Sequence, residues 1–265
     1  MQTTQAAQET KRFFLRFPSY IVACGLLFST AAIAQETPGE NGWKFTIAPY
    51  LWGASLSGTA ATIPGLPPAD VDASFSDILD NLSLAGMIVG NARKGKWGIT
   101  ADLQYISLEN STSDLKPLFD DATVKAKNTI FSLLAEYKLV ESPTGELWGG
   151  AGARYWSVDT SLDLDAGTLP SASANGNNSW VDPVIGLRGR LDVADRTYLT
   201  GWAYAGGFGA GSEQMADIFG GVGYEFTSVT AGVLGYRWLS VDRRSGDFTY
   251  DVEMKGLMAG LRFQF

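Results

Sequence analysis

The side chains of this chain that could do chemistry are carboxylates and guanidiniums, and many of them stand inside apolar segments. In these segments apolar residues recur at every second position, and the charged residues occupy the places between them. Arginine binds a carboxylate through two parallel hydrogen bonds, which lysine cannot do. We therefore expect a charge-balanced network of ion pairs. Its members are Asp102, Glu136, Asp182, Asp217, Glu225, Arg154, Arg188, Arg190, Arg237 and Arg262.

Catalysis has little support, because the chain contains no histidine. Histidine is the side chain whose ordinary pKa suits general acid–base work near neutral pH. No Gly-x-Ser-x-Gly elbow, zinc-ligand cluster or phosphate-binding loop is present either. A pair of carboxylates is the remaining source of acid–base chemistry. An enzyme that works without histidine is therefore the third choice of function, and we expect no catalytic residue and no cofactor.

A second group of carboxylates lies in polar segments. Asp159, Asp163 and Asp165 stand in one of them, and Asp114, Asp120 and Asp121 stand in the preceding one. Carboxylate oxygens are the ligands that hard divalent cations prefer. No calcium-loop spacing is present, so a solvated acidic loop is favoured over a cation site, and no metal is expected.

The segment from Ser74 to Leu82 has the spacing of a short helix. Phe75, Ile78, Leu79 and Leu82 fall on one helical face, and Ser74 with Asp77 could form a capping box. Two roles are open for this helix. It could act as a lid over the mouth of the fold, or it could pack its apolar side against the rim.

The elements that must position these groups are strands. Trp97, Ile99, Ala101, Leu103 and Tyr105 alternate with more polar residues, and so do Leu257 to Phe265. This period of two is typical of strands with one apolar face. Ten such strands are expected (eight as the alternative), with loops at 110–122 and from 159 to 179. They cover 43–56, 84–92, 97–105, 129–139, 147–158, 181–191, 197–208, 218–226, 229–241 and 248–265.

The connections between these strands alternate in length. Those at 93–96, 141–145, 192–196 and 227–228 are short, and the intervening ones are mostly longer and polar. Aromatic residues stand near both ends of the outward-going strands, among them Trp52, Trp148, Trp156 and Tyr198. Short turns opposite long loops, with two aromatic belts, are typical of transmembrane barrels. We therefore predict an all-β, closed, antiparallel up-and-down barrel at 43–265. A lipocalin-like barrel is less favoured, because it does not explain a last strand that is apolar through Phe265.

The N-terminus predicts export. Lys11, Arg12 and Arg16 precede an apolar run from Ile21 to Ala34, and Ala32-Ile33-Ala34 fits a signal-peptidase site. We expect a signal peptide at 1–34 and a polar lead-in at 35–42, whereas a lipoprotein box at Cys24 is disfavoured. On cleavage Lys and Arg fall from 20 to 17 and Asp and Glu from 28 to 27, so the net charge changes from −8 to −10. An acidic chain argues against nucleic-acid partners.

Four stretches carry a family resemblance. Trp43 with Ala48 to Trp52, Gly206 to Ser212, Gly235 to Trp238, and the C-terminal strand resemble uncharacterised proteobacterial outer-membrane β-barrel proteins of Gram-negative cells. The resemblance implies the cell outer membrane, contact with lipid and lipopolysaccharide, and a monomer. It also implies that Leu261, Phe263 and Phe265 form the signal read by the barrel-insertion machinery. It brings no catalytic residue.

Together these patterns leave two functional classes. If the apolar residues face lipid, the ten charged residues point into the lumen. Arg154 is the exception in this assignment, because Trp148 and Trp156 have the same parity and could make that face of the strand the lipid-facing one. A ten-stranded barrel is only slightly wider than the ~8-stranded size that side chains fill completely. A structural or surface-contact protein with a largely plugged lumen is therefore favoured. A narrow, porin-like channel for small solutes or hydrophobic molecules is the alternative.

Overall fold

The computed structural model describes residues 42–265. The predicted signal peptide at 1–34 lies outside the described residues, and so does all but the last residue of the predicted lead-in at 35–42. Within the described range no helix is both long enough and apolar enough to cross a membrane.

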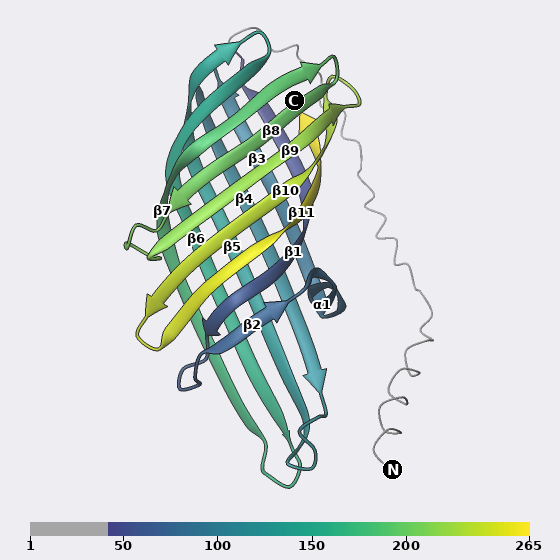
Figure 1. Cartoon of the computed structure of the whole chain (residues 1–265), viewed down its shortest axis with the longest axis vertical. Helices are drawn as coiled ribbons and strands as arrows, with labels where there is room; N and C mark the ends of the chain where they lie inside the picture. The colour runs from purple at the N-terminus through teal and green to yellow at the C-terminus, as the bar shows by residue number, and fades with distance from the viewer. Residues whose placement is uncertain (1–41) are drawn as a thin grey trace, which may run out of the picture. The chain divides into compact units, whose positions relative to one another are not determined.

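The chain forms one closed antiparallel barrel in which each strand pairs with its neighbours in sequence (Figure 1). The first strand, β1, pairs with the last, β11, from Thr46↔Gln264 to Ala61↔Thr249, and this pairing closes the wall. The strand β2 is a short addition to β1, so ten strands make the barrel. The elements are β1 (Lys44–Ala61), β2 (Ala69–Ala73), α1 (Phe75–Asp80), β3 (Leu82–Lys94), β4 (Trp97–Thr112), β5 (Phe119–Ser142), β6 (Gly145–Ala166), β7 (Ala172–Ala194), β8 (Thr197–Gly206), β9 (Gln214–Glu225), β10 (Thr230–Ser245) and β11 (Phe248–Gln264).

The wall alternates between an apolar outside and a filled inside. Leu51 is 75% exposed and Leu257 64%, whereas Tyr50 and Met258, their neighbours in sequence, are buried. A barrel that turns its apolar residues outward is suited to lipid, because its backbone groups are satisfied by pairing between neighbouring strands. The predictions of a ten-stranded transmembrane barrel and of an outer-membrane location are confirmed. The lipocalin-like and eight-stranded alternatives are wrong.

The predicted aromatic belts are wrong for four of their members. Trp52, Trp148, Trp156 and Tyr198 are all buried inside the barrel, at 8% exposure or less. They have the parity of the inward-facing residues on their strands, and a strand cannot turn one residue outward without turning its neighbours inward. These large rings therefore fill the lumen and do not contact lipid.

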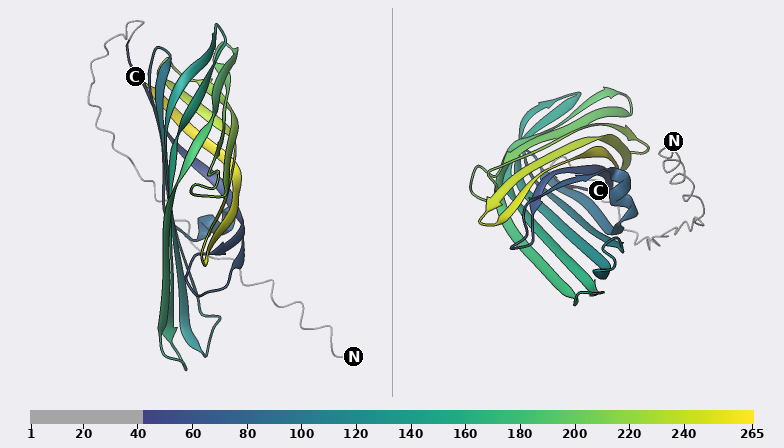
Figure 2. Two further views of the ribbon diagram at one scale, coloured as in Figure 1. Left: turned by 90° about the vertical axis from the view of Figure 1, so that its left-hand side faces the viewer. Right: turned by 60° about the horizontal axis from the view of Figure 1, so that its bottom comes forward.

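Two predicted loops are also wrong, because most of 110–122 and of 159–179 is strand. The strands β5, β6 and β7 have 24, 22 and 23 residues, about twice the ~9–11 that a tilted strand needs to cross a membrane. Their surplus forms a sheet that projects past the ends of β8–β11 (Figure 2). We name it the outer extension: 107–112 of β4, 119–127 of β5, 159–166 of β6 and 172–177 of β7.

The first strand changes its partner partway along. It pairs with β3 only from Lys44↔Arg93 to Pro49↔Ile88, and proline has no N–H group with which to continue a ladder. Beyond this point β1 pairs with β2 instead, at 56–60. The helix α1 follows β2 and lies beside β1 (Figure 1). The N-terminal half of β3 is thus free of β1 on the long-loop side of the barrel.

Deleting Phe265 is expected to reduce the amount of assembled barrel. The Phe265 N–H donates to the Phe45 carbonyl at 2.9 Å, and the Phe45 N–H donates to the Phe265 carbonyl at 3.1 Å. The deletion removes this closing pair together with an aromatic side chain that is 60% exposed on the outside. Heat-modifiable mobility on gels of outer-membrane fractions measures the assembled form. Val229→Ala, at a turn on the same side of the barrel, is the control, and it is expected to leave the amount of assembled barrel unchanged. Wild-type levels of the shortened protein would contradict the assembly role predicted for Leu261, Phe263 and Phe265.

Candidate functional site

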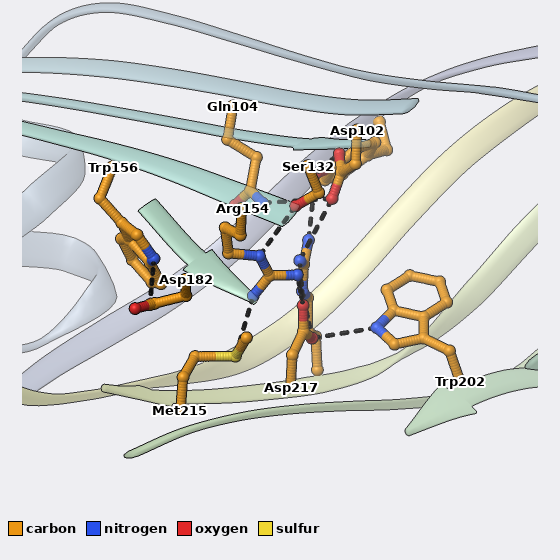
Figure 3. A network of polar contacts seen from close by, with 11 residues as sticks. Asp102, Gln104, Ser132, Arg154, Trp156, Asp182, Trp202, Met215 and Asp217 are labelled. Carbon is orange, nitrogen blue, oxygen red and sulfur yellow. Dashed lines mark hydrogen bonds and ion pairs between the residues drawn. The ribbon is translucent and has the colours of Figure 1, made fainter. Parts of the chain in front are cut away.

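The centre of the lumen holds four charged residues, which we name the ionic layer: Asp102, Arg154, Asp217 and Arg237. Arg154 Nη2 donates to Asp217 Oδ2 at 2.6 Å, and Arg237 Nη2 donates to the same oxygen at 2.7 Å (Figure 3). Arg237 also reaches Asp102 at 3.3 Å. Arg237 and Asp217 are fully buried, and Arg154 is 1% exposed. Two carboxylates and two guanidiniums therefore neutralise one another, and of the four only Asp102, with 12% of its side chain exposed, keeps contact with water.

Neutral side chains complete the hydrogen bonding of this layer. Tyr50 donates its hydroxyl to Asp102 at 2.7 Å and accepts from Arg237 at 3.0 Å. Trp202 donates its Nε1–H to Asp217 at 3.0 Å, and Arg154 Nε donates to Ser132 at 2.8 Å. Charges taken out of water are tolerated when such bonds satisfy their remaining donors and acceptors. The layer holds together strands β1, β4, β5, β6, β8, β9 and β10.

An aromatic layer fills the lumen on the outer side of the ionic layer. Trp156 and Trp180 stack with their ring centroids 5.6 Å apart, and Phe248 and Tyr250 meet Trp180 edge to face. Leu239 is fully buried against them. Apolar residues occur inside this barrel because its centre is packed like a protein core and is not lined like a channel.

Asp182 belongs to this outer region and makes no ion pair within residues 42–265. It accepts hydrogen bonds from Trp156 Nε1 at 2.8 Å and from the backbone and hydroxyl of Ser212, at 2.6 and 2.8 Å. Three donors replace the arginine that charge matching predicts. The backbone N–H of Ser212 comes from the β8–β9 loop, so Asp182 fixes that loop against β7.

The inner side of the ionic layer opens into a cavity of about 700 Å³, which we name the vestibule. It lies on the short-turn side of the barrel, which is periplasmic in outer-membrane barrels. Glu225 accepts from Arg190 at 2.8 Å and from Arg262 at 3.0 Å in its wall. Glu136 is buried nearby, 3.7 Å from Arg93. Arg188 lines the cavity without an ion pair or side-chain hydrogen bond to any residue in 42–265.

The ten charged residues therefore do not form one network. They separate into the ionic layer, the vestibule set (Arg188, Arg190, Glu225 and Arg262), Asp182 with its neutral donors, and Glu136, which pairs with Arg93 outside the predicted set. Sequence reasoning missed Arg93, which it placed in a turn, and the neutral partners Tyr50 and Trp202. Their parity on β1, β3 and β8 is the signal that could have found them, since it matches that of the inward-facing residues.

The acidic residues of the outer extension are not brought together. Asp159 accepts from Asn177 across the β6–β7 pair, and Asp163 lies opposite Ser173. Asp165 follows on the same strand, and Asp114, Asp120 and Asp121 are exposed near the β4–β5 turn. Among residues 42–265 no three such side chains are arranged to hold a metal ion.

The predicted capping box is present at the start of α1. The Asp77 backbone donates to the Ser74 hydroxyl, and Asp77 accepts from the Ser74 backbone at 2.9 Å. The Ser74 hydroxyl also donates to Asp77 Oδ2 at 2.6 Å, and this bond, followed by the one from the Ser74 backbone, holds the pKa of Asp77 below its usual value. The Phe75 ring covers the outward side of Gly53, where an added Cβ would lie 3.3 Å from it. The helix therefore lies on the outside of β1, a position that favours packing over a lid role.

A different segment lies across the inside of the outer extension. A Cβ added to Gly176 would collide with the carbonyl of Thr62, and Ile63 is buried. Gly176 has the inward parity of Trp180 and Asp182. The connection between β1 and β2 therefore contacts the inner face of β7 at the outer end of the lumen, a role that no sequence pattern indicated.

The comparison with one solved structure, OmpT, supports the architecture. No family model and no curated protein matches the sequence. The crystal structure of the outer-membrane protease OmpT from Escherichia coli is similar with a TM-score of 0.54 and 12% identity, over 84% of this chain and 97% of that chain. Ail, the attachment invasion locus protein of Yersinia pestis, has a TM-score of 0.34 and 11% identity, over 85% of this chain and 99% of that chain. The P. putida toluene transporter TodX has a TM-score of 0.32 and 11% identity, over 84% of this chain and 89% of that chain. At these identities the likeness concerns the fold alone.

Proposed function

We propose that this protein is a sealed outer-membrane barrel with a structural or surface-contact role, and that its outer extension is the part that meets other surfaces. The observation that carries the proposal is the ionic layer. Two of its ion pairs cross the lumen where a channel would need water: Arg154 of β6 pairs with Asp217 of β9, and Arg237 of β10 pairs with Asp102 of β4. The aromatic layer packs beyond the ionic layer on the outer side of the same passage.

The outer extension supports the contact role. It raises a four-stranded sheet above the membrane, and the outward face of this sheet carries polar and charged side chains, whereas Leu162 and Leu164 lie on the other face. Ser111 bonds to Thr123, and Lys125 lies 3.3 Å from Glu109. The strands β5, β6 and β7, with 24, 22 and 23 residues, are longer than a crossing of the bilayer requires. A projecting sheet with unpaired outer strands is a suitable platform for binding, since sheet edges offer free N–H and C=O groups.

Other roles have weaker support. A channel would need a path through the ionic layer. The vestibule supplies only the inner part of such a path, because it ends at Tyr50 and Trp202 on the inner boundary of the ionic layer. An enzyme would need an acid–base group, and this chain has no histidine. The fold likeness to OmpT does not supply one. We further propose that the barrel is a monomer, inserted through its C-terminal strand and surrounded by lipid and lipopolysaccharide.

The seal predicts silence in planar lipid bilayers. The unmodified protein is expected to give no large, stable single-channel current, whereas Arg237→Ala is expected to give a steady leak. This change removes a guanidinium that spans Asp102, Asp217 and Tyr50 and leaves the space open to water. Heat-modifiable gel mobility checks that each variant is folded.

Arg190→Ala is the matched control for this experiment. It removes the same side chain from the vestibule, on the periplasmic side of the seal, and is expected to remain silent. Arg154→Ala supplies a second seal variant if Arg237→Ala does not fold. Steady porin-like currents from the unmodified protein would overturn the sealed-barrel proposal in favour of the channel.

A further inference from the structure

The vestibule has a charge opposite to that of the chain around it. The whole chain has a formal net charge of −8. Seven lysine and arginine side chains line the vestibule against four carboxylates, which leaves three positive charges in excess. An excess of one sign in a concave site with low-dielectric walls concentrates ions of the other sign.

The excess resides in three cations that have no carboxylate partner within residues 42–265. Lys44 and Lys96 stand at the periplasmic rim, and Arg188 stands deeper. On β7, Arg188 lies opposite Trp148 of β6 and Trp202 of β8. Its guanidinium carbon is 5.6 Å from the centroid of the Trp202 ring. It therefore keeps its hydrogen-bond donors available to whatever enters the cavity.

Two buried aromatic side chains in the same wall carry polar atoms without partners. Trp148 and Tyr198 are each 2% exposed, and neither Trp148 Nε1 nor the Tyr198 hydroxyl has a hydrogen-bond partner in the described part of the chain. A buried donor that is left unpaired costs about 1–3 kcal/mol. Both residues line the vestibule.

Each of these aromatic rings also lies against two cations. Arg93 and Lys138 lie 4.2 and 5.2 Å from the centroid of Trp148. Arg190 and Arg262 lie 3.7 and 5.2 Å from the centroid of Tyr198. The rings hold the positive groups in place by cation–π attraction. Arg188 lies on β7, between Trp148 of β6 and Tyr198 of β8, so positive charge reaches the cavity from several strands.

We propose that the vestibule is a binding site for a small multivalent oxyanion that enters from the periplasm. Such an anion carries several acceptor oxygens, of the phosphate or polycarboxylate kind, and its charge matches the excess of the lining. Guanidiniums bind these groups through charge-assisted, often bidentate hydrogen bonds. Arg188 is the central binding residue, and Lys44 and Lys96 attract the anion at the rim. This site lies on the periplasmic side of the seal, so it requires no passage through the barrel.

Isothermal titration of the folded, detergent-solubilised protein with inorganic pyrophosphate, and separately with citrate, tests the proposal. At low ionic strength at least one of the two is expected to bind with a stoichiometry near one. Arg188→Gln is expected to weaken binding about tenfold or more. Arg196→Gln removes the same charge from an exposed periplasmic turn outside the vestibule, and binding by this variant is expected to equal that of the unmodified protein. The stronger of the two probes identifies which oxyanion kind fits.

The double variant Lys44→Gln/Lys96→Gln keeps the test decisive if Arg188→Gln does not fold. Both lysines are exposed, so folding is expected to be unaffected while binding weakens and loses part of its dependence on salt. Absence of binding by both anions would overturn the proposal. Equal weakening by Arg196→Gln and Arg188→Gln would overturn it as well, because the attraction would then come from general charge. The bilayer experiment is independent, since a silent barrel can bind the anion or fail to bind it.

Discussion

Replacing Asp217 by Asn is expected to lower the free energy of unfolding of the barrel by about 3–5 kcal/mol. Asp217 accepts from Arg154 at 2.6 Å and from Arg237 at 2.7 and 3.0 Å, and all three residues are buried. The substitution keeps the shape of the side chain but removes its charge. Arg154 is then left without any ion pair, and Arg237 keeps only Asp102 at 3.3 Å. Because this part of the lumen is dry, water cannot replace the ion pairs that the two guanidiniums lose.

Glu225→Gln is a matched control, because Glu225 also accepts from two arginines. Its partners Arg190 and Arg262 lie at 2.8 and 3.0 Å, but its side chain is 31% exposed at the vestibule. Water replaces much of what the substitution removes, so a loss of about 0–1 kcal/mol is expected. Equilibrium unfolding in urea, followed by tryptophan fluorescence in vesicles, measures both variants. Equal losses would mean that burial does not set the strength of the ionic layer.

Replacing Leu257 by Arg is expected to destabilise the barrel by about 2–4 kcal/mol. Leu257 lies on the lipid-facing side of β11 and is 64% exposed. It is eight residues from the C-terminal, periplasmic end of the chain, which places it near the middle of the ~25 Å apolar band for a tilted strand. A guanidinium there must leave water for hydrocarbon. The same unfolding measurement in vesicles gives the loss.

Val229→Arg introduces the same side chain at the membrane edge. Val229 stands in the connection between β9 and β10 and is 40% exposed, so Arg there reaches water and is expected to cost about 0–1 kcal/mol. Full tolerance of Leu257→Arg would show that this face of β11 does not contact lipid.

The sequence by itself determined the barrel. Strands alternate their side chains with a period of two, so the outward face can be read from local order wherever lipid requires it to be apolar. That requirement holds for Leu257, Leu261 and the outward residues of β4, and their faces follow directly. The capping box of α1 is equally local, because Ser74 and Asp77 are three residues apart.

The same dependence on lipid explains the errors in strand length. Residues of the outer extension, such as Asp163 and Thr123, stand above the membrane, where the outward face of a strand meets water and can be polar. Leu162 and Leu164 have the inward parity instead, so the outward apolar pattern ends where the strand leaves the lipid, and the segments resemble loops. Their pairing is visible only when β5, β6 and β7 are laid side by side.

Only the tertiary structure decided which charges meet. The alternation gives Arg154 and Asp182, which are cross-strand neighbours on β6 and β7, the same inward direction. It does not give the height at which either residue meets side chains from the more distant strands. The height of a residue in the lumen depends on the stagger between neighbouring strands. This stagger accumulates from one strand pair to the next around the closed wall. That stagger brings Arg154 to Asp217, 63 positions away in sequence, and leaves Asp182 with Ser212. It also leaves Arg188 without a carboxylate in the described chain, because the nearest level of the lumen contains more cations than anions.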